Sequence, residues 1–270
     1  MLRRVVREHL GAGKRPPRGD APRRARAVDD GPADAQSRKD RLRSGALGLT
    51  GVTEIRHDVF GFAAGNFNTT DFTVEAGSWS VWTVDLTGEE PVTELLADVP
   101  EAGFLLGTAT YGTNSMLVAD AAEGKVYKFD AETGAYEVII EDDLLKPAAD
   151  AQIPEAIHSI RNFGEELYFT NTFGNAFGHF FLNAVTAEVG EVNIVTNLTS
   201  PLDFIIDGNG TSYVGQIGDG IVKVTQDGTV TPMWNITSAT SLAFGRRKAE
   251  FDIIYAGTAV GELYALQIDW

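Results

Sequence analysis

The amino-acid sequence predicts an all-β fold of the β-propeller type, and three observations support this prediction. Short apolar runs that end in small or polar residues recur after residue 48, and their central residues lie 55, 51, 45 and 42 residues apart. This spacing matches the length of one four-stranded propeller blade. A turn and a second alternating strand follow each run, and no segment keeps a helical period for long. The central residues are Phe62, Leu117, Tyr168, Tyr213 and Tyr255.

The expected strands follow one another in a regular order along the chain. The apolar runs are residues 59–66, 115–121, 166–172, 211–217 and 252–258, and the second strands are residues 78–86, 124–131, 178–185, 220–227 and 261–268. A third strand is expected in residues 133–142 and 227–235, because Thr133-Gly134 and Asp227-Gly228 are typical hairpin turns. Five such units account for residues 46–270. They predict either a five-bladed ring or a larger propeller that lacks one blade.

Charge divides the chain into two parts. Residues 1–45 carry 13 Lys and Arg against 6 Asp and Glu, whereas the remainder carries 9 against 32. The first part is also rich in Pro and Ala and has no apolar core of a secretory signal. We therefore expect a basic, disordered extension over residues 1–47 and a propeller domain over residues 48–270. A nucleic-acid-binding arm or an organelle address is the alternative interpretation of the extension.

Composition excludes several classes of function for the propeller domain. An acidic body repels nucleic acid and anionic membranes, and no apolar run approaches the length of a spanning helix. The chain has no Cys, which excludes disulfides, thiolate catalysis and cysteine-bound metals. Four N-glycosylation sequons, at Asn68, Asn197, Asn209 and Asn235, favour a secretory ancestry, although the chain shows no signal peptide. The compartment stays open.

Several segments together resemble one known family. The segments "EIRHDVFGFAAGNFN", "GSWSVWTVDLTG", "EELYFTNTFG", "LDFIIDGNGTSYVG" and "TSLAFGR" are similar in order and spacing to the fungal branch of the SMP-30/gluconolactonase-like six-bladed propellers, over about residues 49–270. That branch includes hetero-Diels–Alderases of meroterpenoid biosynthesis, which join a tropolone-derived quinone methide to a terpene alkene. The resemblance implies a metal-independent enzyme of secondary metabolism, usually secreted, whose first blade and signal are missing here.

The resemblance also frames the question of a metal ion. Lactonases of this superfamily hold a divalent ion with an acidic residue in the first blade, an Asn in a middle blade and an Asp in the next blade. In this sequence His158 replaces the Asn, the Asp falls on Leu202 or Asp203, and the acidic residue has no counterpart. Since too few oxygen ligands remain for a hard cation, we expect no metal and no cofactor. The segment Asp207–Gly210 is expected to form a turn, not a calcium loop.

The candidate site residues come from their expected places at the mouth of the central channel. His158 and Asp203 are the catalytic candidates, because an imidazole exchanges protons near neutral pH and a carboxylate can orient it. Asn66, Phe104, Asn171 and Trp79 are the substrate-binding candidates, as amides for a carbonyl group or as apolar walls. Ordinary structural roles are the alternative: a hydrogen-bonded channel histidine, a turn-capping Asp203, strand-terminating amides and core aromatics.

Three functions therefore stay open at this point. The first is a pericyclase that binds an apolar small molecule, or a quinone methide, in the channel of a monomeric propeller. The second is a metal-dependent lactonase or other hydrolase, and the third is a non-catalytic, truncated propeller. Nothing in the sequence predicts nucleic acid or membrane as a partner of the propeller.

Overall fold

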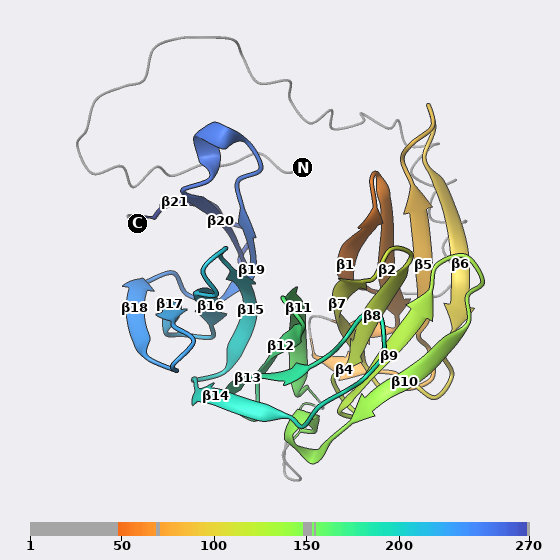
Figure 1. Ribbon diagram of the computed structural model, residues 1–270, viewed down its shortest axis with the longest axis horizontal. Coiled ribbons are helices and arrows are strands. Elements are labelled where there is room, and N and C mark those ends of the chain that lie inside the picture. The colour runs from red at the N-terminus through yellow and green to blue at the C-terminus, as the bar shows by residue number, and fades with distance from the viewer. Residues whose placement is uncertain (1–47, 69–70, 148–152, 154, 269–270) are drawn as a thin grey trace.

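The structure is a computed structural model that describes residues 48–68, 71–147, 153 and 155–268. These residues form five antiparallel sheets that fan out from a common centre, which is the arrangement of propeller blades (Figure 1). The predicted all-β propeller is therefore confirmed. The predicted extension over residues 1–47 lies outside the described part. Among the described residues no helix is long and apolar enough to cross a membrane.

Three blades occupy the first part of the fold. Blade 1 consists of β1 (Gly48–Arg56), β2 (Val59–Gly65), β5 (Ser80–Asp85) and β6 (Val92–Asp98). Blade 2 consists of β7 (Leu105–Tyr111), β8 (Ser115–Asp120), β9 (Lys125–Asp130) and β10 (Tyr136–Glu141). Blade 3 consists of β11 (Ile157–Phe163), β12 (Glu166–Asn171), β13 (Ala176–Phe181) and β14 (Asn193–Asn197).

The last two blades differ in strand number. Blade 4 consists of β15 (Pro201–Ile206), β16 (Ser212–Gln216), β17 (Gly220–Val224) and β18 (Val230–Trp234). Blade 5 has three strands among the described residues, namely β19 (Ala239–Phe244), β20 (Ile253–Thr258) and β21 (Leu263–Gln267). The remaining elements are the hairpin of β3 (Phe67–Asn68) with β4 (Thr73–Val74) and the 3₁₀ turns Asp143–Leu145 and Lys248–Glu250.

The first strand of each blade lies at the centre of the fold. Strands β1, β7, β11, β15 and β19 lie side by side in chain order, and each blade continues outward from its own central strand (Figure 1). The five apolar runs that predicted the repeat are the second strands, β2, β8, β12, β16 and β20. The residues that line the channel therefore come from the strand that precedes each run.

Apolar cores hold neighbouring blades together. One core joins blades 1 and 2 through residues such as Trp79 and Met116, and a second joins blades 2 and 3 through Leu117 and Phe169. Two more join blades 3 to 4 and 4 to 5. No such core among the described residues joins blade 5 to blade 1. Five blades with four shared cores form an open ring.

The glycine-rich segment after β15 is a turn, as predicted. One carboxylate oxygen of Asp207 accepts hydrogen bonds from the backbone N–H of Asn209 at 2.8 Å and of Thr211 at 3.0 Å. Gly210 has a φ of +79°, a left-handed conformation that glycine adopts without strain. The carboxylate of Asp207 therefore closes this hairpin.

Candidate functional site

Each of the five central strands contains a β-bulge near its beginning. The register against the second strand shifts by one residue between Leu49 and Val52 in β1 and between Ile157 and Ile160 in β11. The same shift occurs in β7, β15 and β19. A bulge turns an additional side chain toward one face of a sheet. Because all five bulges lie near the N-terminal ends of the central strands, they concentrate side chains at that end of the channel.

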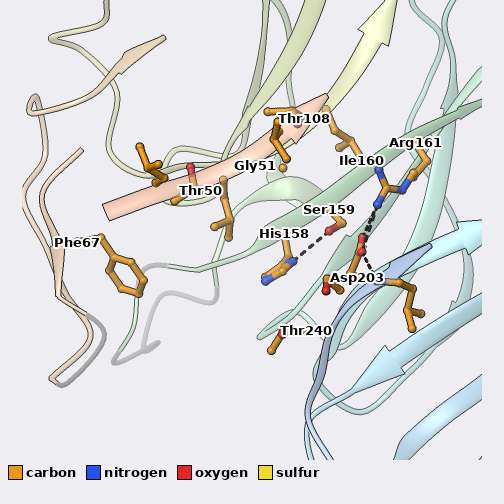
Figure 2. A pocket seen from close by; sticks show the side chains of 16 residues that line it. Thr50, Gly51, Phe67, Thr108, His158, Ser159, Ile160, Arg161, Asp203 and Thr240 are labelled. Carbon is orange, nitrogen blue, oxygen red and sulfur yellow. Dashed lines mark hydrogen bonds and ion pairs between the residues drawn. The ribbon is translucent and has the colours of Figure 1, made fainter. Parts of the chain in front are cut away.

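A cavity of about 400 Å³ lies at this end of the channel, and we name it the front chamber. Figure 2 shows its residues, which come from all five central strands and from β3. Its volume suits a small molecule. Its lining consists of Leu49, Thr50, Gly51, Val52, Phe67, Leu106, Gly107, Thr108, His158, Ser159, Ile160, Arg161, Asp203, Thr240, Ser241 and Leu242.

Glycine at two bulges lets neighbouring blades approach closely. A Cβ on Gly51 would collide with the carbonyl oxygen of Leu106, and a Cβ on Gly107 would collide with that of His158. The corresponding bulge positions of blades 3 and 4 are Ser159 and Asp203. The bulge position therefore carries a polar side chain in blades 3 and 4 and no side chain in blades 1 and 2.

His158 is the imidazole of the front chamber. Its Nδ1 lies 3.3 Å from Oγ of Ser159, and its Nε2 lies 3.7 Å from a carboxylate oxygen of Glu155. The side chain is 17% exposed, and that of Glu155 is 14% exposed. An imidazole between a hydroxyl and a carboxylate can transfer a proton, because the carboxylate stabilises the positive charge that the ring acquires.

Asp203 has a different role from the one predicted. Both of its carboxylate oxygens accept hydrogen bonds from Nη2 of Arg161, at 3.0 and 3.2 Å, and one also accepts from the N–H of Leu242 at 2.8 Å. Asp203 is 6% exposed, so its charge is compensated by Arg161. The pair joins blades 3, 4 and 5 at the bottom of the front chamber (Figure 2). The structure thus gives Asp203 a cross-linking role, and its assignment as a catalytic residue stays a prediction.

Asn66 and Asn171 lie at the same end of the propeller as the front chamber, but one strand farther from the channel. Each follows or ends a second strand, so the central strand lies between it and the chamber. The amide of Asn66 donates to Glu75 at 2.6 Å. The amide of Asn171 donates to the carbonyl oxygen of Leu144 at 2.9 Å, and its oxygen accepts from Gly174. Neither residue lines the front chamber, and their substrate-binding roles stay predictions.

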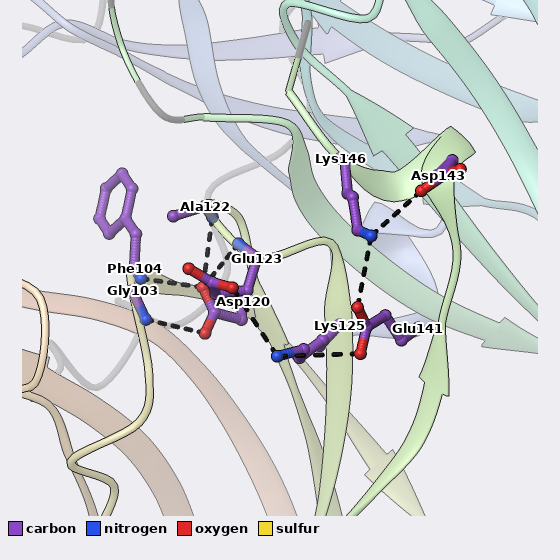
Figure 3. A network of polar contacts seen from close by, with 9 residues as sticks. All are labelled: Gly103, Phe104, Asp120, Ala122, Glu123, Lys125, Glu141, Asp143 and Lys146. Atoms are coloured by element: carbon purple, nitrogen blue, oxygen red, sulfur yellow. Dashed lines mark hydrogen bonds and ion pairs between the residues drawn. The ribbon is translucent and has the colours of Figure 1, made fainter. Parts of the chain in front are cut away.

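Trp79 and Phe104 are buried in the core between blades 1 and 2. Each is 1% exposed, and their rings lie 5.4 Å apart. The backbone N–H groups of Gly103 and Phe104 both donate to Asp120 at 2.9 Å (Figure 3). Burial raises the pKa of Asp120, although these hydrogen bonds oppose the change. Phe67, which packs on Phe104 with ring centres 5.0 Å apart, is the aromatic residue that reaches the chamber.

The residues present do not fit the metal site that the family resemblance implies. Leu202 is apolar, and Asp203 already binds a guanidinium group. Among the described residues, no cluster of three or more His, Cys, Asp or Glu could hold an ion. We therefore derive no step of the reaction through a metal.

Arg161 is the functional candidate that sequence reasoning missed. It follows His158 by three residues on β11, and its Nε donates to the carbonyl oxygen of Phe204 at 2.9 Å. In the sequence it looks like an ordinary cation on a strand surface. The signal that could have found it is its place on the same central strand as His158 in an acidic domain.

Comparisons with known proteins show the fold alone. No protein-family description matches the sequence, and neither does any curated protein. A chain of the nidogen/laminin complex is similar in structure at 13% identity, with a TM-score of 0.59 over 82% of this chain and 76% of that chain. A luciferin-regenerating enzyme is similar at 12% identity, with a TM-score of 0.54 over 78% and 83%.

A third similar structure is a virginiamycin B lyase from Staphylococcus aureus, a catalytically inactive variant with quinupristin. It is 13% identical and has a TM-score of 0.52 over 85% of this chain and 73% of that chain. These solved structures are β-propeller proteins, and they place this chain in the same fold. At such identities they transfer neither substrate nor mechanism.

Proposed function

We propose that this protein is a small-molecule enzyme whose front chamber holds a substrate oxygen against His158, without a bound metal ion. The observation that carries the proposal is His158 itself, an imidazole that lines the chamber between Ser159 and Glu155. Asp203, the carboxylate of the same chamber, is already bound to Arg161. Two similar propellers, the lyase and the luciferin-regenerating enzyme, are themselves named as enzymes. Replacement of a histidine by alanine inactivates that lyase.

The reaction that we propose within this class is a hetero-Diels–Alder cycloaddition of secondary metabolism, as the family resemblance implies. Such a reaction needs two partners held together and a hydrogen bond to a carbonyl group, which makes the diene more electrophilic. The N–H of His158 supplies that bond, and no net proton transfer is required. The apolar side chains of Leu49, Val52 and Phe67 supply walls for an apolar partner.

The test is adduct formation from a tropolone-derived quinone methide and a terpene alkene, measured above the spontaneous rate with EDTA present. We expect His158→Ala to lower the enzymatic rate by about 100-fold, the lower end of the usual effect of removing one hydrogen-bond donor that stabilises charge in the transition state. His57→Ala is the matched control, because the side chain of His57 is 90% exposed and does not line the chamber. A wild-type rate equal to background, or full activity of His158→Ala, would contradict the proposal. Adduct formation that EDTA abolishes would contradict the metal-free mechanism, and metal-dependent hydrolysis of a lactone would favour the hydrolase instead.

A further inference from the structure

A second cavity continues the channel behind the Arg161–Asp203 pair. It has a volume of about 580 Å³, and we name it the rear chamber. Along each central strand its residues follow those of the front chamber, and Val52, Arg161 and Leu242 line both. Its lining consists of Val52, Thr53, Glu54, Phe60, Thr110, Arg161, Asn162, Ile205, Ile206, Leu242, Ala243, Phe244 and Arg246.

The rear chamber contains two guanidinium groups inside an acidic protein. Two guanidinium groups, from Arg161 and Arg246, face one carboxylate, from Glu54. The chain as a whole carries a formal charge of −16. Because Asp203 pairs with Arg161 and Glu54 pairs with Arg246, the attraction for an anionic ligand comes from the guanidinium N–H groups that these pairs do not use.

The hydrogen bonds of Arg161 leave part of its guanidinium group free. Nε donates to the carbonyl oxygen of Phe204, and Nη2 donates to Asp203. Within the described part of the chain, Nη1 donates to no protein acceptor. The Arg161 side chain is 36% exposed and lines both chambers. A carboxylate is the partner that a guanidinium edge binds most strongly.

The other walls of the rear chamber are apolar. They include Phe60 of blade 1, Phe244 of blade 5, and Ile205 and Ile206 of blade 4. These side chains suit a flat apolar body more than a sugar or a phosphate group.

We propose that the rear chamber binds a small amphipathic carboxylate, with its acid group on Arg161 Nη1 and its apolar body between Phe60 and Phe244. The site is separate from the reaction proposed at His158, and its argument does not depend on that reaction. Arg246 is 83% exposed and pairs with Glu54 at 3.3 Å, a weak surface contact that a ligand carboxylate can replace.

The test uses 2-naphthoate as the probe and 2-naphthamide as its uncharged analogue, both titrated by calorimetry. We expect the acid to bind at least about tenfold more tightly than the amide, because the charge-assisted pair to Arg161 is lost in the amide. Arg161→Met should remove this preference. Arg247→Met is the matched control and should keep it, because Arg247 does not line the chamber. His158→Ala should also keep it, even if the proposed reaction fails.

Arg161 also joins three blades, so its replacement can impair folding. Phe244→Glu is the second variant, since it places a negative charge in the chamber without touching the Arg161–Asp203 pair. We expect this variant to bind 2-naphthoate more than about tenfold more weakly than the wild-type protein does, and the loss of affinity for 2-naphthamide to be smaller. The proposal would be overturned if the wild-type protein bound acid and amide equally well. It would also be overturned if Arg247→Met lost as much affinity for 2-naphthoate as Phe244→Glu does.

Discussion

Single residues at the bulges decide what the channel can contain. Where the bulge residue is glycine, at Gly51 and Gly107, the next blade packs directly against the backbone. Where it is Ser159 or Asp203, a polar side chain takes that space, and it binds His158 in one case and Arg161 in the other. The bulge position therefore adds a polar side chain to the front chamber in blades 3 and 4 and none in blades 1 and 2, which contribute Thr50 and Thr108 from neighbouring positions.

Gly107→Ala tests the close approach of blades 2 and 3. The new Cβ would collide with the carbonyl oxygen of His158 and lie 2.9 Å from Cα of Ser159. Both atoms belong to the bulge of β11, which is part of blade 3 and cannot move independently of it. We expect a loss of about 1–3 kcal/mol in the free energy of unfolding, as for other overpacked sites. Urea denaturation measures it. Gly208→Ala is the control, because a Cβ there meets no atom within 4 Å and φ is not left-handed. Equal midpoints for the two variants would show that the blades are not in close contact.

At the scale of the element, the repeat was visible in the second strand of each blade and not in the central strand. The second strands, such as β12, have apolar side chains on both faces and gave clear runs around Tyr168 and Tyr213. The central strands gave no clear run, because their bulges break the alternation and Gly51 or Gly107 replaces an apolar residue.

The same cause explains which site residues could be predicted. His158 and Asp203 were placed in the channel through the family resemblance, and both line the front chamber. Asn66 and Asn171 were inferred from the ends of the visible runs, so they fell one strand outward. The pairing of Arg161 could not be predicted, since its partner Asp203 lies 42 residues away in another blade.

Tyr168 of β12, which packs between blades 3 and 4, makes the stability of the protein depend on pH. Its ring stacks on that of His179 at 5.0 Å, and burial, with a smaller contribution from Glu166, raises the pKa of its hydroxyl to about 12. The folded protein then holds this proton more tightly than the unfolded chain, where the pKa is about 10. The contribution of Tyr168 is present below pH 10 and is lost as the pH rises toward 12.

The free energy of unfolding should therefore decrease less between pH 9 and pH 11 in Tyr168→Phe than in the wild-type protein. The difference between the two decreases should be on the order of 1 kcal/mol. Urea denaturation at the two pH values measures the difference, and comparison within each protein cancels the cost of removing the hydroxyl. Parallel losses in the two proteins would show that the hydroxyl of Tyr168 reaches solvent in the folded state.

At the scale of the whole molecule, two apolar sheet faces have no neighbouring blade among the described residues. On blade 1 this face carries Phe60, Phe62 and Val84, and Leu95 on it is 46% exposed. On blade 5 it carries Ile253 and Tyr255, and Leu263 is 50% exposed. None of these residues belongs to the four cores that join blades.

The open ring predicts an uneven distribution of stability among the blades. Blades 2, 3 and 4 pack on both faces, whereas blade 5 packs on blade 4 alone and has three strands among the described residues. The ion pair between Arg246 and Glu54 reaches across to blade 1, but an exposed pair of this kind contributes at most about 1 kcal/mol. Blade 5 should therefore open locally at a lower free energy than the middle blades.

Hydrogen–deuterium exchange followed by mass spectrometry tests this expectation on equivalent strands. The amides of β20 in blade 5 should exchange faster than those of β16 in blade 4 and β12 in blade 3, although all three are paired on both sides within their sheets. Arg246→Gln should change the exchange of β20 only slightly, because the ion pair contributes little. Equal protection of β20, β16 and β12 would mean that a further contact closes the ring. A large effect of Arg246→Gln would identify the Arg246–Glu54 pair as that contact.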